Sequence, residues 1–131
     1  MQKPRVISVG KLSLANNLKL NLIAGPCALE SRDHAFDMAG ALSEISKEFD
    51  VGFIYKTSYD KANRTSFNAS RGLGINDSLA IFEAIKKEFG CPVLTDIHTV
   101  DEAIKVAPSV DVLQIPAFLC RQTDLLLAAG K

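Results

Sequence analysis

Short apolar runs alternate with longer amphipathic segments four times along the chain. The runs cover residues 20–25, 51–58, 92–97 and 111–118, and each is rich in β-branched or aromatic residues. Several are almost continuously apolar, which is typical of strands buried on both faces. Strand followed by helix, four times over, predicts a parallel sheet covered by helices, and therefore an α/β fold.

The segments between the runs carry apolar residues at intervals of three and four, as helices with one buried face do. In residues 31–49 these positions are Ala35, Met38, Ala39, Leu42, Ile45 and Phe49. Ser31 is the expected N-cap of this helix. Residues 76–90 repeat the pattern, with Asn76 as the expected cap and Gly90 as the stop.

Shorter helices are predicted over residues 99–109 and 121–130. At the N-terminus, two short apolar runs flank Gly10-Lys11 and predict a β-hairpin within residues 4–16. No linker or change of composition divides the chain, so we expect one domain: the hairpin, then βα units over residues 20–131.

Composition excludes several classes of protein. The chain is 47% hydrophobic, with 15 basic and 15 acidic residues among 131, which gives no reason to expect nucleic acid or a membrane surface as partner. No apolar run approaches the roughly 18 residues that span a bilayer, and the N-terminus lacks a signal-peptide core. Three cysteines, an odd number, favour a reducing compartment and a cytoplasmic protein.

Basic and polar residues gather where the second strand ends, in "YKTSYDKANRTSF" (55–67). This stretch sets Lys56, Lys61 and Arg64 against a single acid, Asp60. It opens the long connection 59–75, and long loops in compact domains are often functional. Ligands of α/β folds bind at the carboxyl ends of strands. The pattern therefore predicts a site for phosphate or carboxylate groups, held by Lys61, Asn63 and Arg64.

Each of these residues also has an ordinary structural explanation. Lys56 ends an apolar strand, where it either faces a polar cavity or extends its amine to the rim of the sheet. Lys61, Asn63 and Arg64 would equally suit a solvated basic loop. Composition alone leaves both interpretations open.

Further candidates follow the other strands. Asp96 and His98 end the third strand, where a carboxylate binds a sugar hydroxyl, orients a base, holds a metal or caps the next helix. Gln114 interrupts an apolar run, and a buried glutamine must find hydrogen-bond partners. Cys27 follows the first strand and is either a thiolate ligand for a metal or a small inert hydrophobe.

Five segments together resemble, in order and spacing, the family of 3-deoxy-D-manno-octulosonate 8-phosphate synthases. They are "IAGPCALES", "YKTSYDKANRTSF", "RGLG", "PVLTDIHTVDEA" and "DVLQIPAFLCRQTDLLLAAGK". The combination of "KANR" with "QIPAFLCRQTDL" is the most specific part. The related 3-deoxy-D-arabino-heptulosonate 7-phosphate synthases share the barrel and the phosphoenolpyruvate chemistry, but "KANRTS" is more similar to the eight-carbon enzymes.

The resemblance implies a reaction and roles for named residues. These enzymes condense phosphoenolpyruvate with D-arabinose 5-phosphate, release phosphate and make a precursor of lipopolysaccharide. Lys56 and Lys61 would lie against phosphoenolpyruvate and the reacting carbonyl, and Asp96 would complete the catalytic set. The other implied roles are substrate binding by Asn63, Arg64 and Thr65 (often serine in the family), the pocket floor for Asp96 and Gln114, and a subunit interface for Phe118 and Arg121.

The resemblance also implies a metal. Family members of the metal-dependent type have cysteine in the "GPC" position, so Cys27 is the expected ligand of a divalent ion such as Zn, Fe or Mn. The remaining ligands and further phosphoenolpyruvate contacts are expected downstream. A homotetramer, in which Arg121 reaches a neighbour's sugar phosphate, is likewise implied by the resemblance alone.

Length is the main departure from the family. A complete (β/α)8 TIM barrel needs about 250 residues, so these 131 residues are expected to form its first half, about four βα units. Two hypotheses stay open. The chain is the N-terminal half of a synthase and inactive alone, or it is a half-barrel that binds sugar phosphates without catalysis.

Overall fold

A parallel four-stranded sheet forms the centre of the molecule. The computed structural model describes residues 4–61 and 71–131. Its sheet has the order β3-β4-β5-β6, so each strand pairs with the next one along the chain. The strands are β3 (Asn21–Ala24), β4 (Gly52–Lys56), β5 (Val93–Asp96) and β6 (Val112–Gln114). This arrangement confirms the predicted α/β fold, the first half of a TIM barrel.

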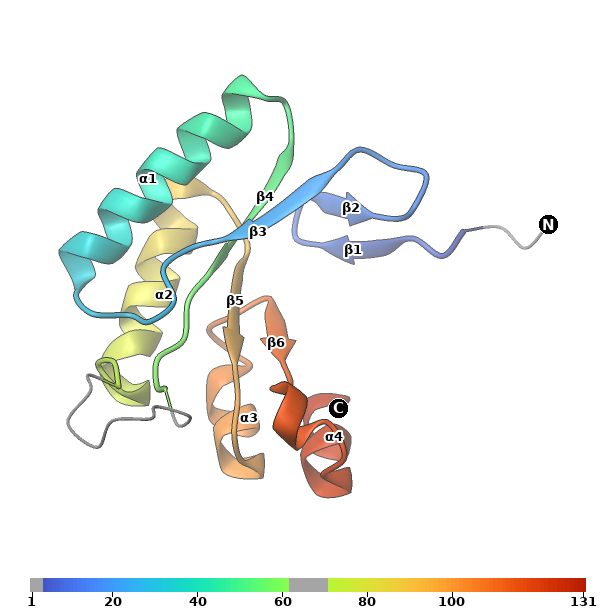
Figure 1. Cartoon of the computed structure of the whole chain (residues 1–131), viewed down its shortest axis with the longest axis vertical. Helices are drawn as coiled ribbons and strands as arrows, with labels where there is room; N and C mark the ends of the chain where they lie inside the picture. The colour runs from blue at the N-terminus through green and yellow to red at the C-terminus, as the bar shows by residue number, and fades with distance from the viewer. Residues whose placement is uncertain (1–3, 62–70) are drawn as a thin grey trace.

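Helices follow each strand along the sheet (Figure 1). They are α1 (Arg32–Glu48), α2 (Ile75–Phe89), α3 (Val100–Val106) and α4 (Thr123–Ala129), with a 3-10 helix, η1 (Ala117–Leu119), before α4. Crossovers between parallel strands are right-handed, and here the strand order always advances in one direction. All crossovers therefore put their helices on the same face of the sheet, as in a barrel.

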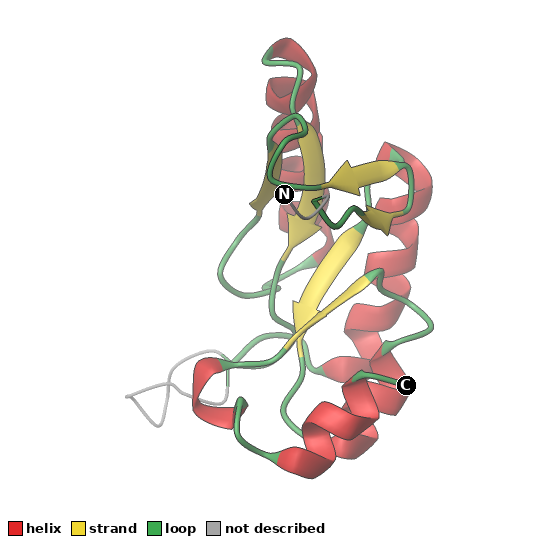
Figure 2. Cartoon of the chain, turned by 90° about the vertical axis from the view of Figure 1, so that its right-hand side faces the viewer, coloured by secondary structure: helices red, strands yellow, loops and turns green. Residues whose placement is uncertain are grey.

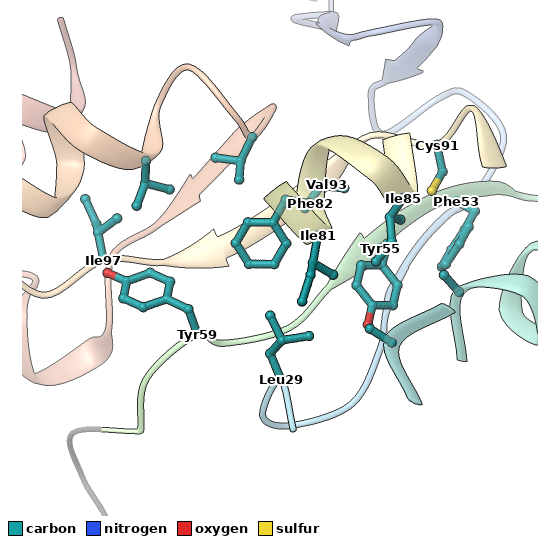
Figure 3. Packing of buried hydrophobic residues seen from close by; sticks show 14 of the residues in the cluster. Leu29, Phe53, Tyr55, Tyr59, Ile81, Phe82, Ile85, Cys91, Val93 and Ile97 are labelled. Atoms are coloured by element: carbon teal, nitrogen blue, oxygen red, sulfur yellow. The ribbon is translucent and has the colours of Figure 1, made fainter. Parts of the chain in front are cut away.

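The core lies between that face and the helices (Figure 3). Phe53 and Tyr55 of β4 point into it together with Phe82 and Ile85 of α2. Because side chains alternate along a strand, Ile54 and Lys56 point to the opposite face, which would be the inside of a barrel. The same alternation puts Leu94 and Asp96 of β5 on that inner face.

The N-terminal hairpin pairs β1 (Ile7–Val9) with β2 (Leu12–Leu14) across a turn at Gly10. Its backbone and side chains lie against Gly52 and Pro92, where β4 and β5 begin. Figure 2 shows the strands of the sheet running away from the hairpin. The predicted hairpin is thus confirmed, and it leaves the carboxyl ends of the strands open.

Several predicted boundaries differ from the structure. Asn76 is not an N-cap, because α2 starts one residue before it and its cap is Gly74, at φ 81°. The Asn76 amide oxygen instead accepts a hydrogen bond from Lys105. In α1, Ser31 caps as expected by accepting from the backbone of His34, but Ile45 and Phe49 are exposed.

The last predicted strand is also shorter than its apolar run. It ends at Gln114, because Pro116 has no N–H to give to a ladder, and the chain turns into η1. Within residues 4–61 and 71–131, no helix combines the length and apolar character that crossing a membrane requires.

Candidate functional site

A cavity of about 560 Å³ opens where β4, β5 and β6 end. This is the edge at which parallel α/β sheets bind ligands. Its lining combines charged residues from the ends of β4 and β5 with the apolar residues of η1. The residues are Lys56, Asp60, Lys61, Asp96, His98, Gln114, Pro116, Ala117, Phe118 and Leu119.

Two lysines give the cavity its positive charge. Lys56 is half-buried at the end of β4, on the inner face, because its strand neighbours Phe53 and Tyr55 occupy the core face. The Lys61 ammonium donates a hydrogen bond of 2.7 Å to the hydroxyl of Ser58. Neither lysine forms an ion pair within the part of the chain that the structure describes.

Asp60, the one acid of the basic stretch, is occupied elsewhere. Arg71 donates two hydrogen bonds to its carboxylate, at 2.8 and 2.6 Å, and the backbone N–H of Lys61 donates to the carbonyl of Arg71. This fork geometry is the strong form of a charged pair, and Asp60 holds the pKa of Arg71 above its usual value. The two cavity lysines are therefore left to attract anions.

Asp96 supplies a carboxylate beside these cations. Its side chain ends β5, and Oδ2 lies 3.2 Å from Nε2 of His98. The other oxygen, Oδ1, is buried and has no hydrogen-bond partner among the described residues. A buried acceptor without a partner is costly, so this oxygen is suited to accept a hydrogen bond from a hydroxyl group of a ligand.

Sequence reasoning missed two residues behind His98. The Tyr59 hydroxyl donates to Oε2 of Glu102 at 2.9 Å, and this oxygen also accepts from the backbone N–H of His98 at 2.8 Å. Burial, with the hydrogen bond to Glu102 next in effect, raises the pKa of Tyr59 far above its usual value. The only signal in the sequence was the Thr99-to-Glu102 spacing of a helix capping box.

The remaining predicted residues lie at different places. Gln114 lines the cavity but is exposed, so the expectation of a buried glutamine was wrong. The reason is that β6 is the last strand of this sheet, and the described residues place no further strand beside it. Phe118, on η1 at the cavity rim, is 89% exposed. Arg121 is exposed in the turn before α4.

Asn63, Arg64 and Thr65 lie outside the described residues. Cys27 is an exposed free thiol just after β3. The described residues contain no group of three or more His, Cys, Asp or Glu side chains that could hold a metal ion. Cys27 is available as one ligand, but the described part of the chain does not bring two further histidine, cysteine or acidic side chains to it.

Comparison with known proteins gives one consistent answer. The DAHP synthetase I family model matches residues 5–131. Three similar curated proteins are each called 2-dehydro-3-deoxyphosphooctonate aldolase. The protein of Bartonella henselae is 57% identical over 100% of this chain and 47% of its own length. Those of Bartonella quintana and Brucella ovis are both 58% identical, over 99% and 95% of this chain and 47% and 45% of their own lengths. The chain thus spans about half the length of these relatives.

Proposed function

Because the chain belongs to the DAHP synthetase I family, we propose that it contributes half of the active site of an octulosonate phosphate synthase. The reaction joins phosphoenolpyruvate to D-arabinose 5-phosphate and gives 3-deoxy-D-manno-octulosonate 8-phosphate and phosphate. The relatives that are 56–58% identical carry the name of the octonate enzyme, which favours the eight-carbon product over the heptulosonate alternative.

One observation carries this proposal: Lys56 and Lys61 line a cavity at the carboxyl ends of the strands without ion-pair partners among the described residues. Both substrates are polyanions. Phosphoenolpyruvate carries a phosphate and a carboxylate, and an ammonium group binds either as a mobile point charge. The apolar residues of η1 complete a cavity in which these charges are partly shielded from water.

In the proposed reaction, C3 of phosphoenolpyruvate forms a bond to the aldehyde carbon, and the aldehyde oxygen takes a proton to become a hydroxyl. Water adds at C2, and the tetrahedral intermediate breaks the C2–O bond to phosphate while the new hydroxyl gives its proton to the departing phosphate, which leaves a ketone at C2. Lys56 and Lys61 would hold the anionic groups and stabilise charge on the aldehyde oxygen. Asp96 and Gln114 would bind the hydroxyls of the sugar, while Asn63, Arg64 and Thr65 would take its phosphate.

The proposal includes a divalent metal, for which Cys27 is the one ligand assigned in this chain. The thiol is exposed beyond β3, and as a thiolate it would suit Zn, Fe or Mn, with the other ligands supplied from outside these 131 residues. When bound, such an ion polarises a carbonyl or lowers the pKa of a water molecule. The three free thiols also favour a reducing, cytoplasmic location.

A homo-oligomer, in the family a tetramer, completes the proposal. The exposed ring of Phe118 stands at the cavity rim, where a second subunit would cover it and Arg121 would reach the neighbour's sugar phosphate. Large exposed apolar groups beside polar ones are typical of such interfaces.

The experiment is phosphate release from phosphoenolpyruvate with each aldehyde in turn. We expect release with arabinose 5-phosphate and little with erythrose 4-phosphate. Preference for erythrose 4-phosphate would overturn the eight-carbon assignment. Binding of arabinose 5-phosphate without any release of phosphate would instead support the half-barrel that binds sugar phosphates without catalysis.

A further inference from the structure

Three side chains hold the ring of His98: the cavity residue Asp96, and Glu102 and Tyr59, which do not line the cavity. Nε2 of its ring lies 3.2 Å from Asp96 Oδ2, and Nδ1 lies 3.3 Å from Glu102 Oε2. The ring of Tyr59 packs edge-on against it, with ring centres 5.8 Å apart. Among the described residues, Nδ1 is buried and has no hydrogen-bond partner, so its contact with Glu102 is one of proximity. The two titratable carboxylates and the tyrosine therefore leave the imidazole little freedom to turn.

Helix capping accounts for only part of this arrangement. Thr99 caps α3 by accepting from the backbone N–H of Glu102 at 3.2 Å, and a capping box would return the Glu102 carboxylate to the N–H of Thr99. The carboxylate bonds instead to the N–H of His98 and to the hydroxyl of Tyr59. This oxygen thus links Tyr59, in the segment after β4, to His98, the residue that contacts Asp96.

Tyr59 is the distant member of this link. It is 1% exposed, and in Figure 3 its hydroxyl points away from Phe82 and toward Ile97, at the end of β5. A buried tyrosine hydroxyl normally finds a partner, and here the partner is a half-buried carboxylate. Tyr59, Glu102 and His98 thus contact one another behind Asp96 in the cavity wall.

The consequence falls on Asp96. With Oδ2 directed to His98, the carboxylate has one orientation, and Oδ1 is the buried oxygen without a partner in the described structure. A side chain that supporting hydrogen bonds hold in one orientation binds a substrate more tightly than a freely rotating one, because less conformational freedom is lost on binding.

We infer that Glu102 and Tyr59 are positioning residues: together they fix the His98 imidazole against Asp96, so that Asp96 Oδ1 is presented to a hydroxyl group of the aldehyde substrate. This inference rests on the proposed function, in which the aldehyde is a polyhydroxy sugar phosphate. It assigns no proton transfer to His98. It does assign the aldehyde substrate, and not phosphoenolpyruvate, to the Asp96 side of the cavity.

A measurement without catalysis tests the first half of the inference. The chain has two histidines, His34 and His98, so the imidazole ¹⁵N NMR signals of the two are separable, and His34→Gln assigns them. Glu102→Ala and Tyr59→Phe are expected to shift or broaden the His98 signals and leave those of His34 in place. Thr99→Ala breaks the cap without touching the ring and is expected to leave both. Unchanged His98 signals in Glu102→Ala would overturn the inference.

Kinetics test the second half, in the active enzyme that carries this sequence. Glu102→Ala is expected to raise the KM for arabinose 5-phosphate about 10-fold, in the range for residues that support a ligand, with the KM for phosphoenolpyruvate within about twofold. Tyr59→Phe, which leaves α3 capped, is expected to shift the same constant in the same direction. Thr99→Ala is the matched control and is expected to change neither constant.

The outcomes separate the inference from the proposed function. Equal effects of Glu102→Ala and Thr99→Ala, or equal changes in both KM values with a lower melting temperature, would mean a purely structural role and overturn the inference. Failure of the unaltered enzyme to release phosphate would overturn the proposed function. In that case the NMR comparison still decides whether Glu102 and Tyr59 fix His98.

Discussion

Gly25 follows β3 and lies against the backbone at the end of β4. A Cβ atom here would overlap the carbonyl oxygen of Lys56, so any larger residue must push the two strand ends apart beside the cavity. We expect Gly25→Ala to lower the free energy of unfolding by about 1–3 kcal/mol, as overpacking does. Urea denaturation measures this change.

Gly40 gives the matched control, because it is the same substitution on a helix. Its added Cβ would meet the Phe89 ring at 3.4 Å, an ordinary contact. Alanine also favours a helix interior over glycine by about 0.5–1 kcal/mol. Gly40→Ala is therefore expected to stabilise, and a stabilising Gly25→Ala would contradict the close approach of β3 to Lys56.

Lys61 tests the anion site at the level of one charge. Lys61→Gln removes a cavity cation and is expected to lower kcat/KM for phosphoenolpyruvate about 10- to 100-fold, the effect of losing a charged hydrogen bond worth about 1.5–3 kcal/mol. Lys87→Gln makes the same change on an exposed part of α2 and is expected to have no effect. Equal kinetics for both variants would move the site away from Lys61.

Both tyrosines are expected to resist ionisation at high pH. Burial is the main cause that raises the pKa of Tyr55 and of Tyr59, whereas in the unfolded chain both titrate near about 10. The folded state therefore binds more protons above that pH, and the stability contributed by these residues, present below pH about 10, is lost as pH rises further.

The composition makes this titration readable, since the chain has two tyrosines and no tryptophan. Absorbance at 295 nm should stay low through pH about 10 and then rise in one step as the chain unfolds. In guanidinium the midpoint should return to about 10. Tyrosinate absorbance that appears near pH 10 before any loss of helix signal would show that the rings are accessible.

At the scale of elements, Asp111, the residue before β6, joins β5 and α2. Its carboxylate accepts from the backbone N–H of Val93 at 2.9 Å and pairs with Lys86 of α2 at 3.1 Å. Val93 is fully buried, so losing its acceptor is expected to cost about 1–3 kcal/mol. Denaturation should show this loss for Asp111→Ala and a smaller one for Asp111→Asn, whose amide oxygen still accepts. Equal losses would assign the effect to the ion pair instead.

The elements themselves were predictable from the sequence. Continuous apolar runs reflect burial of strands in a sheet, and apolar residues at intervals of three and four reflect burial of one helix face. Their ends were not. Asn76 has the chemistry of a cap, but the positive φ of Gly74 decides where α2 begins. Gln114 was expected to be buried because its run is apolar, although no strand lies beyond β6 in the described sheet.

The site was predictable to the same degree. Residues at strand ends, such as Lys56 and Asp96, could be found because parallel strands bring their carboxyl ends to one edge. The link between Tyr59 and Glu102 joins residues 43 positions apart, and no local pattern encodes such a contact. Supporting residues of this kind become visible only when the strands are in register.

At the scale of the whole molecule, the sheet resembles one side of a barrel. Its inner face carries the cavity residues Lys56 and Asp96. The strands at its two ends, β3 and β6, each have one unpaired side within the described sheet. Beside β6 lies a second hollow of about 620 Å³, lined by the hairpin, β6 and α4. Unpaired strand edges and apolar hollows favour association with other protein surfaces. We therefore expect that the oligomeric state affects how the cavity beside β6 is enclosed.

Phe118 offers a direct test of that assembly. It is 89% exposed at the rim of the cavity, and Phe49, at the end of α1, is 69% exposed. If a second subunit covers η1, Phe118→Asp places a charge in the interface and is expected to lower the molar mass measured by light scattering at a fixed protein concentration. Phe49→Asp adds the same charge at a site for which we propose no partner, and its mass should equal that of the unaltered protein.

An unaltered protein that is monomeric at every concentration would contradict the proposed oligomer. An equal fall in mass for both variants would place the interface elsewhere, and Arg121 would then lose its proposed role toward the neighbouring sugar phosphate.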